Sequence, residues 1–388
     1  MAKNAVKVLI APDSFKEALP ATEVVEAICR GLQMASPKLV CIPCPLADGG
    51  EHTLDVWLYH VQGRRHHIKV GDALGRPRAV AIGLSADGRT ALVELAQAAG
   101  LEHIAVAQRN PLYMSTFGVG QMIRAAARQG ASSLVLTLGG SATHDCGAGM
   151  AAALGWRFLD ETGTAFVPTG ATLDRVVRIE PPESPCQFQE VIAWCDVQNP
   201  LLGPQGAAHT YAAQKGATPE EVALLERKTH HFAQLLEHTM GCAVASIPGS
   251  GAAGGMGAGA MVFLGARLVP GAAWLLDEIG FDQYLTQAHW LITGEGQFDA
   301  QTAHGKLIAT VAARAQHREV GVVVLCGSLE ATPEQIRAMG VTAAMSIVPG
   351  PVDLSQSLTH TSEWLTYAAW AVGRIIIHTD SSTGNSSK

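Results

Sequence analysis

Residues 291–307 read LITGEGQFDAQTAHGKL, and the rest of the chain is best understood around this stretch. Its apolar start, Leu291–Thr293, predicts a buried strand, and the glycines at 294 and 296 would let the backbone turn and approach a ligand. Glu295 and Asp299 add carboxylates, and Lys306 precedes an alanine-rich run typical of a helix. Carboxylates and a lysine beside a helix start suit a metal-bound phosphate. An ordinary strand, turn and helix with solvated charges would show the same pattern.

The composition is that of a folded, enzyme-like protein. The chain has 388 residues, enough for two domains and a large core, and it is 48% hydrophobic and 16% charged. Its net charge of −7 and few aromatic residues argue against a nucleic-acid partner. No apolar run approaches the ~20 residues that span a bilayer. The scattered cysteines indicate free thiols, so we expect a cytoplasmic protein with no membrane partner.

The first 60 residues follow a β-α-β-α pattern. Strands are predicted at Lys7–Ala11 and Leu39–Ile42, with one helix beginning near Leu19–Glu23 and another ending near Tyr59. This alternation is typical of a parallel sheet, whose ligands bind at the carboxyl ends of the strands. The turns after the two strands carry polar side chains: Asp13, Ser14, Lys16, Asp48 and Glu51.

The pattern changes after Gly63. Short extended runs at 68–70, 79–84 and 91–95, joined by tight turns, favour antiparallel pairing and predict entry into a second domain. A strong strand at Leu134–Leu138 then leads into a glycine- and hydroxyl-rich loop, which suits an anion cradle of backbone amides. The polar residues of this loop and of the next ones are Ser141, Thr143, Asp145, Asp196 and Lys215.

From Leu291 the parallel pattern returns, with strands predicted at Val322–Leu325 and Ala343–Ile347 and a helix at Ser362–Ile377. We therefore predict an α/β protein with a discontinuous parallel-sheet domain of Rossmann or flavodoxin type. This domain is expected to comprise residues 1–65 and 286–376. A second α/β domain, residues 66–285, would be inserted between them, and residues 377–388 would be a disordered tail.

A glycine-rich run, residues 249–259, contains the pattern G-x-G-x-x-G of dinucleotide-binding proteins. Pro248 separates it from the preceding run, and no acidic residue follows at the end of a second strand, so the pattern is a weak signal. Phosphate approach at Gly251, Gly254 and Gly255 or tight helix packing explains the glycines better. A dinucleotide-dependent hydroxyacid oxidoreductase stays open as an alternative function.

Seven stretches together carry a specific resemblance. They are IAPDSFKEALPATE (10–23), PLADGGEHT (45–53), LGGSATHDCGAGM (138–150), CDVQNPLLGPQGA (195–207), AAQKGA (212–217), PGSGAAGGMGAG (248–259) and ITGEGQFDAQTAHGK (292–306). In this order they resemble the bacterial glycerate kinase family, the type found in glyoxylate and glucarate breakdown. The resemblance implies ATP-dependent, Mg²⁺-dependent phosphorylation of D-glycerate, usually at the 2-hydroxyl. It also implies a two-domain α/β fold with the active site in the interdomain cleft.

The sequence departs from the family pattern at a few positions. His52 stands where we expect glycine, and His144 and Cys146 stand where we expect asparagine and glycine. Ala212-Ala213 replace a usual Gly-Pro pair. The charged residues of the motifs are all present, so we expect the activity to be kept and only fine specificity to differ.

The chemistry of phosphoryl transfer suggests roles for these residues, which the resemblance does not assign. Lys16 or Lys306 would pair with the substrate carboxylate or the transferred phosphate, and Asp48 or Asp196 would orient the hydroxyl or take its proton. Candidate Mg²⁺ ligands are Glu51, Asp145 and Asp299. Further substrate- or phosphate-binding candidates are Asp13, Ser14, Ser141, Thr143, Lys215, Gly251, Gly254, Gly255 and Glu295. A non-catalytic metabolite sensor, 3-phosphorylation and a homo-oligomer stay open.

Overall fold

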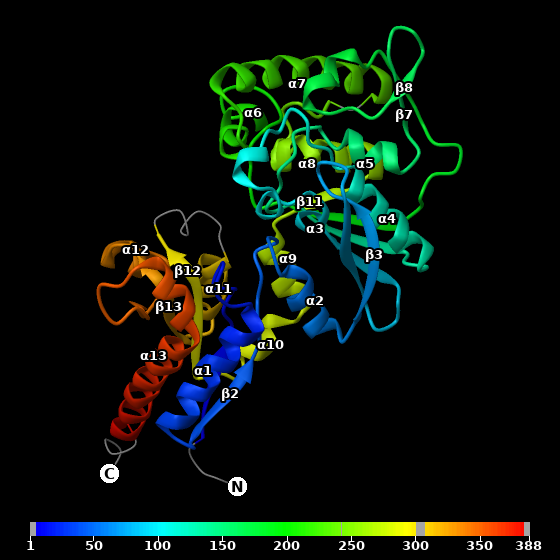
Figure 1. The fold of residues 1–388 in the computed structure, drawn as a ribbon. Helices are drawn as coiled ribbons and strands as arrows, with labels where there is room; N and C mark the ends of the chain where they lie inside the picture. Colours follow the sequence, from blue (N-terminus) through cyan, green and yellow to red (C-terminus); the bar gives the residue numbers. More distant parts are fainter. Residues whose placement is uncertain (1–4, 242, 300–306, 384–388) are drawn as a thin grey trace. The chain divides into compact units, whose positions relative to one another are not determined.

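A five-stranded parallel sheet includes strands from both ends of the chain (Figure 1). The computed structural model describes residues 5–241, 243–299 and 307–383. The chain divides into two units. The first unit contains the residues up to Asp48 and from Ala272 onward, and the second contains Gly49–Gly271.

The sheet of the first unit has the strand order β14-β13-β12-β1-β2, and every neighbouring pair is parallel. Its strands are β1 (Val6–Ile10), β2 (Leu39–Pro43), β12 (Trp290–Phe298), β13 (Gly321–Leu329) and β14 (Ala343–Ser346). Its helices are α1 (Ala21–Ala35), α9 (Gly271–Glu278), α10 (Phe281–Leu285), α11 (Leu307–Gln316), α12 (Pro333–Ala338) and α13 (Leu354–Thr383). The predicted β-α-β start and the returning parallel strands are thus present.

The order of these strands creates a switch point between β1 and β12. From β1 the chain continues to β2 on one side, whereas β12, β13 and β14 follow one another on the other side. In open α/β sheets, ligands bind beside the carboxyl ends of the strands where the order reverses. The polar residues after β1 therefore lie where this rule places a ligand.

Strand β12 is longer than predicted. Residues 294–296 do not turn, because β12 pairs with β13 from Trp290 to Phe298. A Cβ atom on Gly294 would lie 2.0 Å from the carbonyl oxygen of Leu325. The glycine is thus needed for close approach of two strands, which is a common reason for glycine inside a strand.

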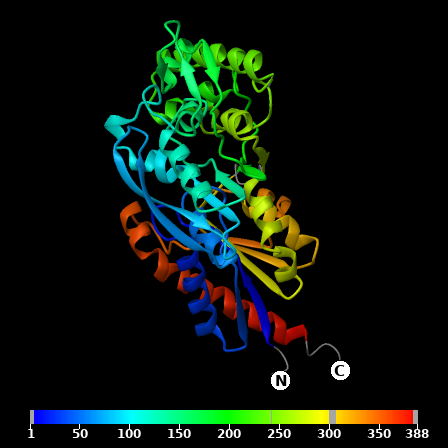
Figure 2. The ribbon, with the colours of Figure 1, turned by 90° about the vertical axis from the view of Figure 1, so that its right-hand side faces the viewer.

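Helix α13 packs along α1 in the core of the first unit (Figures 1 and 2). The two helices are so close that a Cβ atom on Gly31 would lie 2.2 Å from the carbonyl oxygen of Thr366. α13 begins at Leu354 and continues to Thr383, so the prediction of a disordered tail from residue 377 is wrong as far as 383. No helix in the described part of the chain is both long and apolar enough to cross a membrane.

The second unit contains a six-stranded sheet of order β11-β10-β6-β5-β4-β3. β5, β6, β10 and β11 are parallel, and β3 and β4 are added antiparallel, as the short runs after Gly63 predicted. A small antiparallel sheet has the order β8-β7-β9. The strands are β3 (Arg64–Gly71), β4 (Pro77–Leu84), β5 (Thr90–Glu94), β6 (Ser133–Thr137), β7 (Arg157–Leu159), β8 (Ala165–Phe166), β9 (Arg178–Glu180), β10 (Glu190–Trp194) and β11 (Arg267–Val269).

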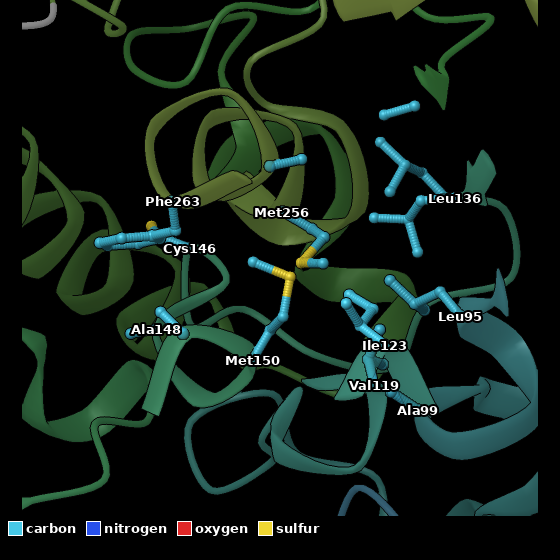
Figure 3. Close-up of a cluster of buried hydrophobic side chains, with 14 of the residues drawn as sticks. Leu95, Ala99, Val119, Ile123, Leu136, Cys146, Ala148, Met150, Met256 and Phe263 are labelled. Atoms are coloured by element: carbon cyan, nitrogen blue, oxygen red, sulfur yellow. The ribbon is translucent and has the colours of Figure 1, made fainter. Parts of the chain in front are cut away.

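The helices of the second unit include α7, whose capping box joins Thr218 and Glu221. They are α2 (Thr53–Val61), α3 (Leu95–Ala99), α4 (Phe117–Arg128), α5 (Ala148–Ala153), α6 (Ala207–Tyr211), α7 (Pro219–Met240) and α8 (Ala252–Leu264), with short 3-10 turns at 101–103, 106–108, 170–175 and 213–215. Figure 3 shows the core formed by several of these helices and strands, where the sulfur atoms of Met150 and Met256 point toward each other.

The boundaries of the units differ from the predicted residues 65 and 286. α2 belongs with the second unit, because a Cβ atom on Gly83 of β4 would lie 2.5 Å from Leu54 and 3.0 Å from Trp57 of that helix. α10 and most of α9 belong with the first unit, where Arg314 of α11 pairs with Asp277 and Asp282. These contacts join residues far apart in sequence, so local patterns do not indicate them.

Candidate functional site

The switch point of the first unit gathers charged side chains around Asp13. The backbone N–H of Asp13 donates to the carbonyl oxygen of Gly294 (2.9 Å), which joins the end of β1 to β12. The Asp13 carboxylate is buried and accepts from the backbone N–H of Ser14 (2.6 Å). Burial and the neighbouring carboxylates of Asp48 and Glu295 raise the pKa of Asp13 well above its usual range, against the opposing effects of Ser14 and Lys16.

Lys16 supplies the positive charge of this cluster. It is exposed, and the turn around it lies against β12: a Cβ atom on Gly296 would lie 3.5 Å from the backbone nitrogen of Lys16. The structure thus brings together Asp13 and Lys16 after β1, Asp48 after β2 and Glu295 within β12. Clustered carboxylates with one lysine suit a ligand that carries both a cation and anionic groups.

Two other candidates belong to the opening stretch. Asp299 follows β12 directly and is half-buried. Lys306 lies outside the described residues, so its predicted catalytic role stays a prediction.

Lys215 is the buried cation of the second unit. Its side chain is 2% exposed, and its Nζ donates to the Ser141 hydroxyl (3.0 Å) and the Thr143 carbonyl oxygen (2.8 Å). Burial lowers the pKa of Lys215 to about 7, although the charge of Asp145 opposes this shift. Lys215 therefore stabilises the loop after β6. A contact between Lys215 and a phosphate would be a second role in addition to this structural one.

Asp145 is a structural carboxylate. It is fully buried, and its oxygens accept from the backbone N–H groups of Thr116 (2.7 Å), Gly147 (3.1 Å) and Gly149 (3.3 Å) and from the Thr116 hydroxyl (2.9 Å). Burial raises the pKa of Asp145, and these hydrogen bonds oppose the shift. The carboxylate thereby joins the starts of α4 and α5. Its predicted role as a Mg²⁺ ligand stays a prediction.

Glu51 and Asp196 both lie in loops of the second unit. The half-buried Glu51 lies against the loop after β6, since a Cβ atom on Gly140 would be 3.0 Å from its Oε1. The exposed Asp196 follows β10, and its Oδ1 accepts from the backbone N–H of Gly271 (2.8 Å). Within the described ranges, no group of three or more His, Cys, Asp or Glu residues is placed to hold a metal ion by itself. The three predicted ligands are divided between the units, with Asp299 in the first.

The glycine-rich run before and within α8 packs against other backbone. The N–H of Gly251 donates to Asn199 and that of Gly255 donates to Gly251, so these two amides are already used. A Cβ atom on Gly251 would lie 2.1 Å from the Pro200 carbonyl oxygen, and one on Gly254 would lie 2.1 Å from that of Thr143. Tight packing therefore explains the G-x-G-x-x-G pattern, and no feature of the run favours a dinucleotide.

We expect Gly254→Ala to lower the free energy of unfolding by about 3 kcal/mol. Gly254 has φ +68 and no room for a methyl group, so left-handed strain and overpacking both act. Gly163→Ala is the matched control, because its φ is +79 but no atom lies within 4 Å of the added Cβ; it should lose only about 1 kcal/mol. Urea unfolding of both variants measures the difference, and equal losses would contradict the packing role.

Glu94 is a polar residue of the strand ends that the sequence analysis missed. It ends β5, is 4% exposed, and accepts from the backbone N–H groups of His52 (3.2 Å) and Leu54 (3.1 Å) at the start of α2. Burial raises its pKa to about 7, against these hydrogen bonds. Its position at the end of a parallel strand is the signal that could have identified it.

His144, a departure from the family pattern, predicts a pH-dependent stability. Its side chain is fully buried, Nε2 contacts the Thr229 hydroxyl (3.0 Å), and Nδ1 has no hydrogen-bond partner among the described residues. Burial and the nearby Lys215 charge lower the pKa of His144 from 6.5 to about 3. Between pH 6.5 and pH 3, His144 is protonated in the unfolded chain but not in the folded protein. The free energy of unfolding therefore falls as the pH falls through this range.

We therefore expect the wild type to lose about 2 kcal/mol relative to His144→Asn when the pH is lowered from 7 to 5. The comparison cancels the other titrating groups, which both proteins share. Urea unfolding at the two pH values gives the difference. Parallel stability curves for the two proteins would show that His144 does not titrate as its burial requires.

Comparisons with known proteins agree on one family. The family model described as the glycerate kinase family matches residues 8–377. A glycerate kinase from Halalkalibacterium halodurans is 40% identical over 365 residues, covering 93% of this chain and 96% of the relative. The glycerate 2-kinase of Escherichia coli is 35% identical over 348 residues, covering 88% and 91%.

A solved structure agrees with the sequence relatives. A crystal structure assigned to glycerate kinase 2 from Salmonella typhimurium superimposes with a TM-score of 0.85 at 36% identity, covering 97% of this chain and all of that one. The likeness spans both units. The chain therefore belongs to the glycerate kinase family and is an enzyme of the kinase class.

Proposed function

We propose that this enzyme transfers a phosphoryl group from ATP to D-glycerate, at the 2-hydroxyl, with Mg²⁺. The observation that carries the proposal is the cluster of Asp13, Lys16, Asp48 and Glu295 at the switch point of the parallel sheet. Family membership narrows this chemistry to glycerate, and the relative from Escherichia coli, named glycerate 2-kinase, favours the 2-hydroxyl. The interdomain cleft that the resemblance implies is part of this proposal.

The cluster suits the charges of the reactants. Lys16 would attract the carboxylate of glycerate or the transferred phosphate, and Asp48 or Asp196 would orient the hydroxyl or take its proton. The buried Asp13, with its raised pKa, is protonated more readily than an ordinary carboxyl and can donate a hydrogen bond when protonated. In the second unit, Lys215 holds Ser141 and Thr143, whose loop we assign to phosphate contact.

The carboxylates of this cluster also fit Mg²⁺. In phosphoryl-transfer sites Mg²⁺ is held by one or two carboxylates together with substrate phosphates and water, so no complete protein cage is needed. Glu295 of the cluster and Asp299, which follows β12, are the candidates in the first unit, and Glu51 and Asp145 stay the predicted candidates in the second. When bound with the nucleotide, Mg²⁺ would neutralise phosphate charge. Burial raises the pKa of Asp13 most, and the charges of Asp48 and Glu295 raise it further, so a bound cation would stabilise the ionised carboxylates of this cluster.

Release of ADP from Mg-ATP and D-glycerate tests the proposal, with L-glycerate as the matched control. Adding enolase without phosphoglycerate mutase distinguishes the products, because only 2-phosphoglycerate is converted directly. With D-glycerate we expect ADP release, which stops with excess EDTA and returns when Mg²⁺ is added. With enolase present, we expect the product to be converted to phosphoenolpyruvate. Glycerate binding without ADP release would support a sensor instead, and turnover without phosphoenolpyruvate would assign the 3-hydroxyl.

A further inference from the structure

Two thiols of the first unit lie together, apart from the switch-point cluster. Cys29 is on α1 and Cys41 is on β2, and both are half-buried. The sulfur of Cys41 is 4.0 Å from the backbone carbonyl oxygen of Cys29, and the two thiols share a hydrogen bond. The helix and the strand are joined by a short turn, so the pair is close in sequence as well as in space.

The two thiols differ in acidity from each other and from the buried cysteines. A hydrogen bond between the two thiols lowers the pKa of Cys41 and raises that of Cys29. Burial instead raises the pKa of Cys44 and Cys326 to about 12 and that of Cys195 to about 11. A thiolate that is partly accessible reacts with oxidants, whereas buried thiols are inert. Cys41 is therefore the attacking sulfur of the pair, and Cys29 is the second thiol beside it.

We propose that Cys29 and Cys41 form an oxidation-sensitive pair that closes to an intrachain disulfide when it meets hydrogen peroxide. The Cys41 thiolate attacks one peroxide oxygen, the O–O bond breaks, and hydroxide leaves, taking up the proton released when the Cys41 thiol ionised to become water; Cys41 is left as a sulfenic acid. The Cys29 sulfur then attacks the Cys41 sulfur, the S–O bond breaks, and the hydroxyl leaves as water with the Cys29 proton. Two thiols and one peroxide thus become one disulfide and two waters.

The disulfide would tie α1 to β2 across 12 positions of the chain. A cross-link restricts the unfolded chain, so the oxidised protein should unfold at a higher temperature, and dithiothreitol should reverse the shift. β2 leads into the loop that carries Asp48, so the bond would also fix the base of one loop of the switch-point cluster. The proposal does not depend on the substrate of the enzyme.

The test treats the full-length protein with hydrogen peroxide and digests it without reduction. We expect a linked peptide pair containing Cys29 and Cys41, about 2 Da lighter than the separate thiol peptides. Cys29→Ser should leave a sulfenic acid on Cys41 that dimedone traps, and Cys41→Ser should give much less adduct on Cys29. Cys186→Ser is the matched control, because it removes another half-buried cysteine and should leave the linked pair unchanged.

Three results would overturn the proposal. One is that Cys29 and Cys41 of the wild type are still alkylated as separate thiols after peroxide treatment. The peroxide dose is the one that gives the dimedone adduct on Cys41 in Cys29→Ser. Another is faster oxidation of Cys186 than of Cys41 in the wild type. The last is a melting temperature that peroxide raises equally in the wild type and in Cys41→Ser. Circular dichroism of each serine variant confirms that the variant is folded before the comparison is made.

Discussion

An Asp145→Ala variant should lose about 4 kcal/mol of free energy of unfolding, the largest effect on stability that we expect. The substitution removes the acceptor of three buried backbone N–H groups, at Thr116, Gly147 and Gly149. Each buried donor left without a partner costs roughly 1–3 kcal/mol, and relaxation recovers part of the sum. The carboxylate joins the starts of α4 and α5, so its loss loosens both helices.

Urea unfolding measures this effect, and Asp87→Ala is the control. Asp87 also accepts hydrogen bonds from its own turn, from the Ser85 hydroxyl and the Arg89 backbone N–H, but it is exposed. Its loss should cost less than about 1 kcal/mol, because water replaces the missing partner. If Asp145→Ala were as stable as Asp87→Ala but lost activity that extra Mg²⁺ restored, Asp145 would be a metal ligand and the structural role would be wrong.

An Asp196→Asn variant should lower turnover of D-glycerate by at least ~100-fold, as loss of a positioned base does. The exposed carboxylate follows β10, and its Oδ1 accepts from the backbone N–H of Gly271 (2.8 Å). Asparagine keeps an oxygen acceptor for that hydrogen bond and removes only the charge and the basicity. The fold around α9 should therefore be unchanged, and the loss should appear in kcat rather than in stability.

Steady-state kinetics of Asp196→Asn and of the matched surface variant Asp87→Asn give the comparison. Asp87→Asn also keeps an acceptor oxygen and removes a charge, so its kcat should match that of the wild type. Near-normal turnover by Asp196→Asn would remove Asp196 from the catalytic residues and leave the role of base to Asp48. An equal fall in melting temperature and kcat would assign Asp196 to the structure instead.

The elements that the sequence predicts well are those with a local signal. β1, α1 and β2 follow from the β-α-β pattern of the first residues, and the two strands and the start of α1 lie within a few residues of the prediction. β12 was predicted too short, because glycines at 294 and 296 resemble a turn when β13 is not known to pair with them. The tail was predicted as disordered from its polar composition, whereas α13 continues to Thr383. For β12 a distant partner overrides the local preference.

The candidate site was predictable only in part, for a similar reason. That polar residues after β1 and β2 gather beside Glu295 of β12 follows from parallel strands, whose carboxyl ends share one edge. Composition does not distinguish a carboxylate that binds a ligand from one that accepts hydrogen bonds from the N–H groups at the start of a helix. The sequence does not show that Asp145 accepts from Thr116, which lies 29 positions earlier. Nor does it show that Lys215 donates to Ser141, which lies 74 positions away.

The pairing of β1 with β12 has a consequence for synthesis on the ribosome. β1 lies between β12 and the edge strand β2 in its sheet. The Thr293 hydroxyl donates to the carbonyl oxygen of Ala11, which is 282 positions away in the sequence. Until β12 has been synthesised, the edge of β1 that pairs with it has no hydrogen-bonding partner. Unpaired strand edges of this kind can pair with other chains. The intervening unit, whose first strands form local hairpins, can fold while that edge waits. The nascent chain is therefore most exposed to aggregation between the synthesis of β1 and that of β12, so translation speed through residues 49–289 sets how long that exposure lasts.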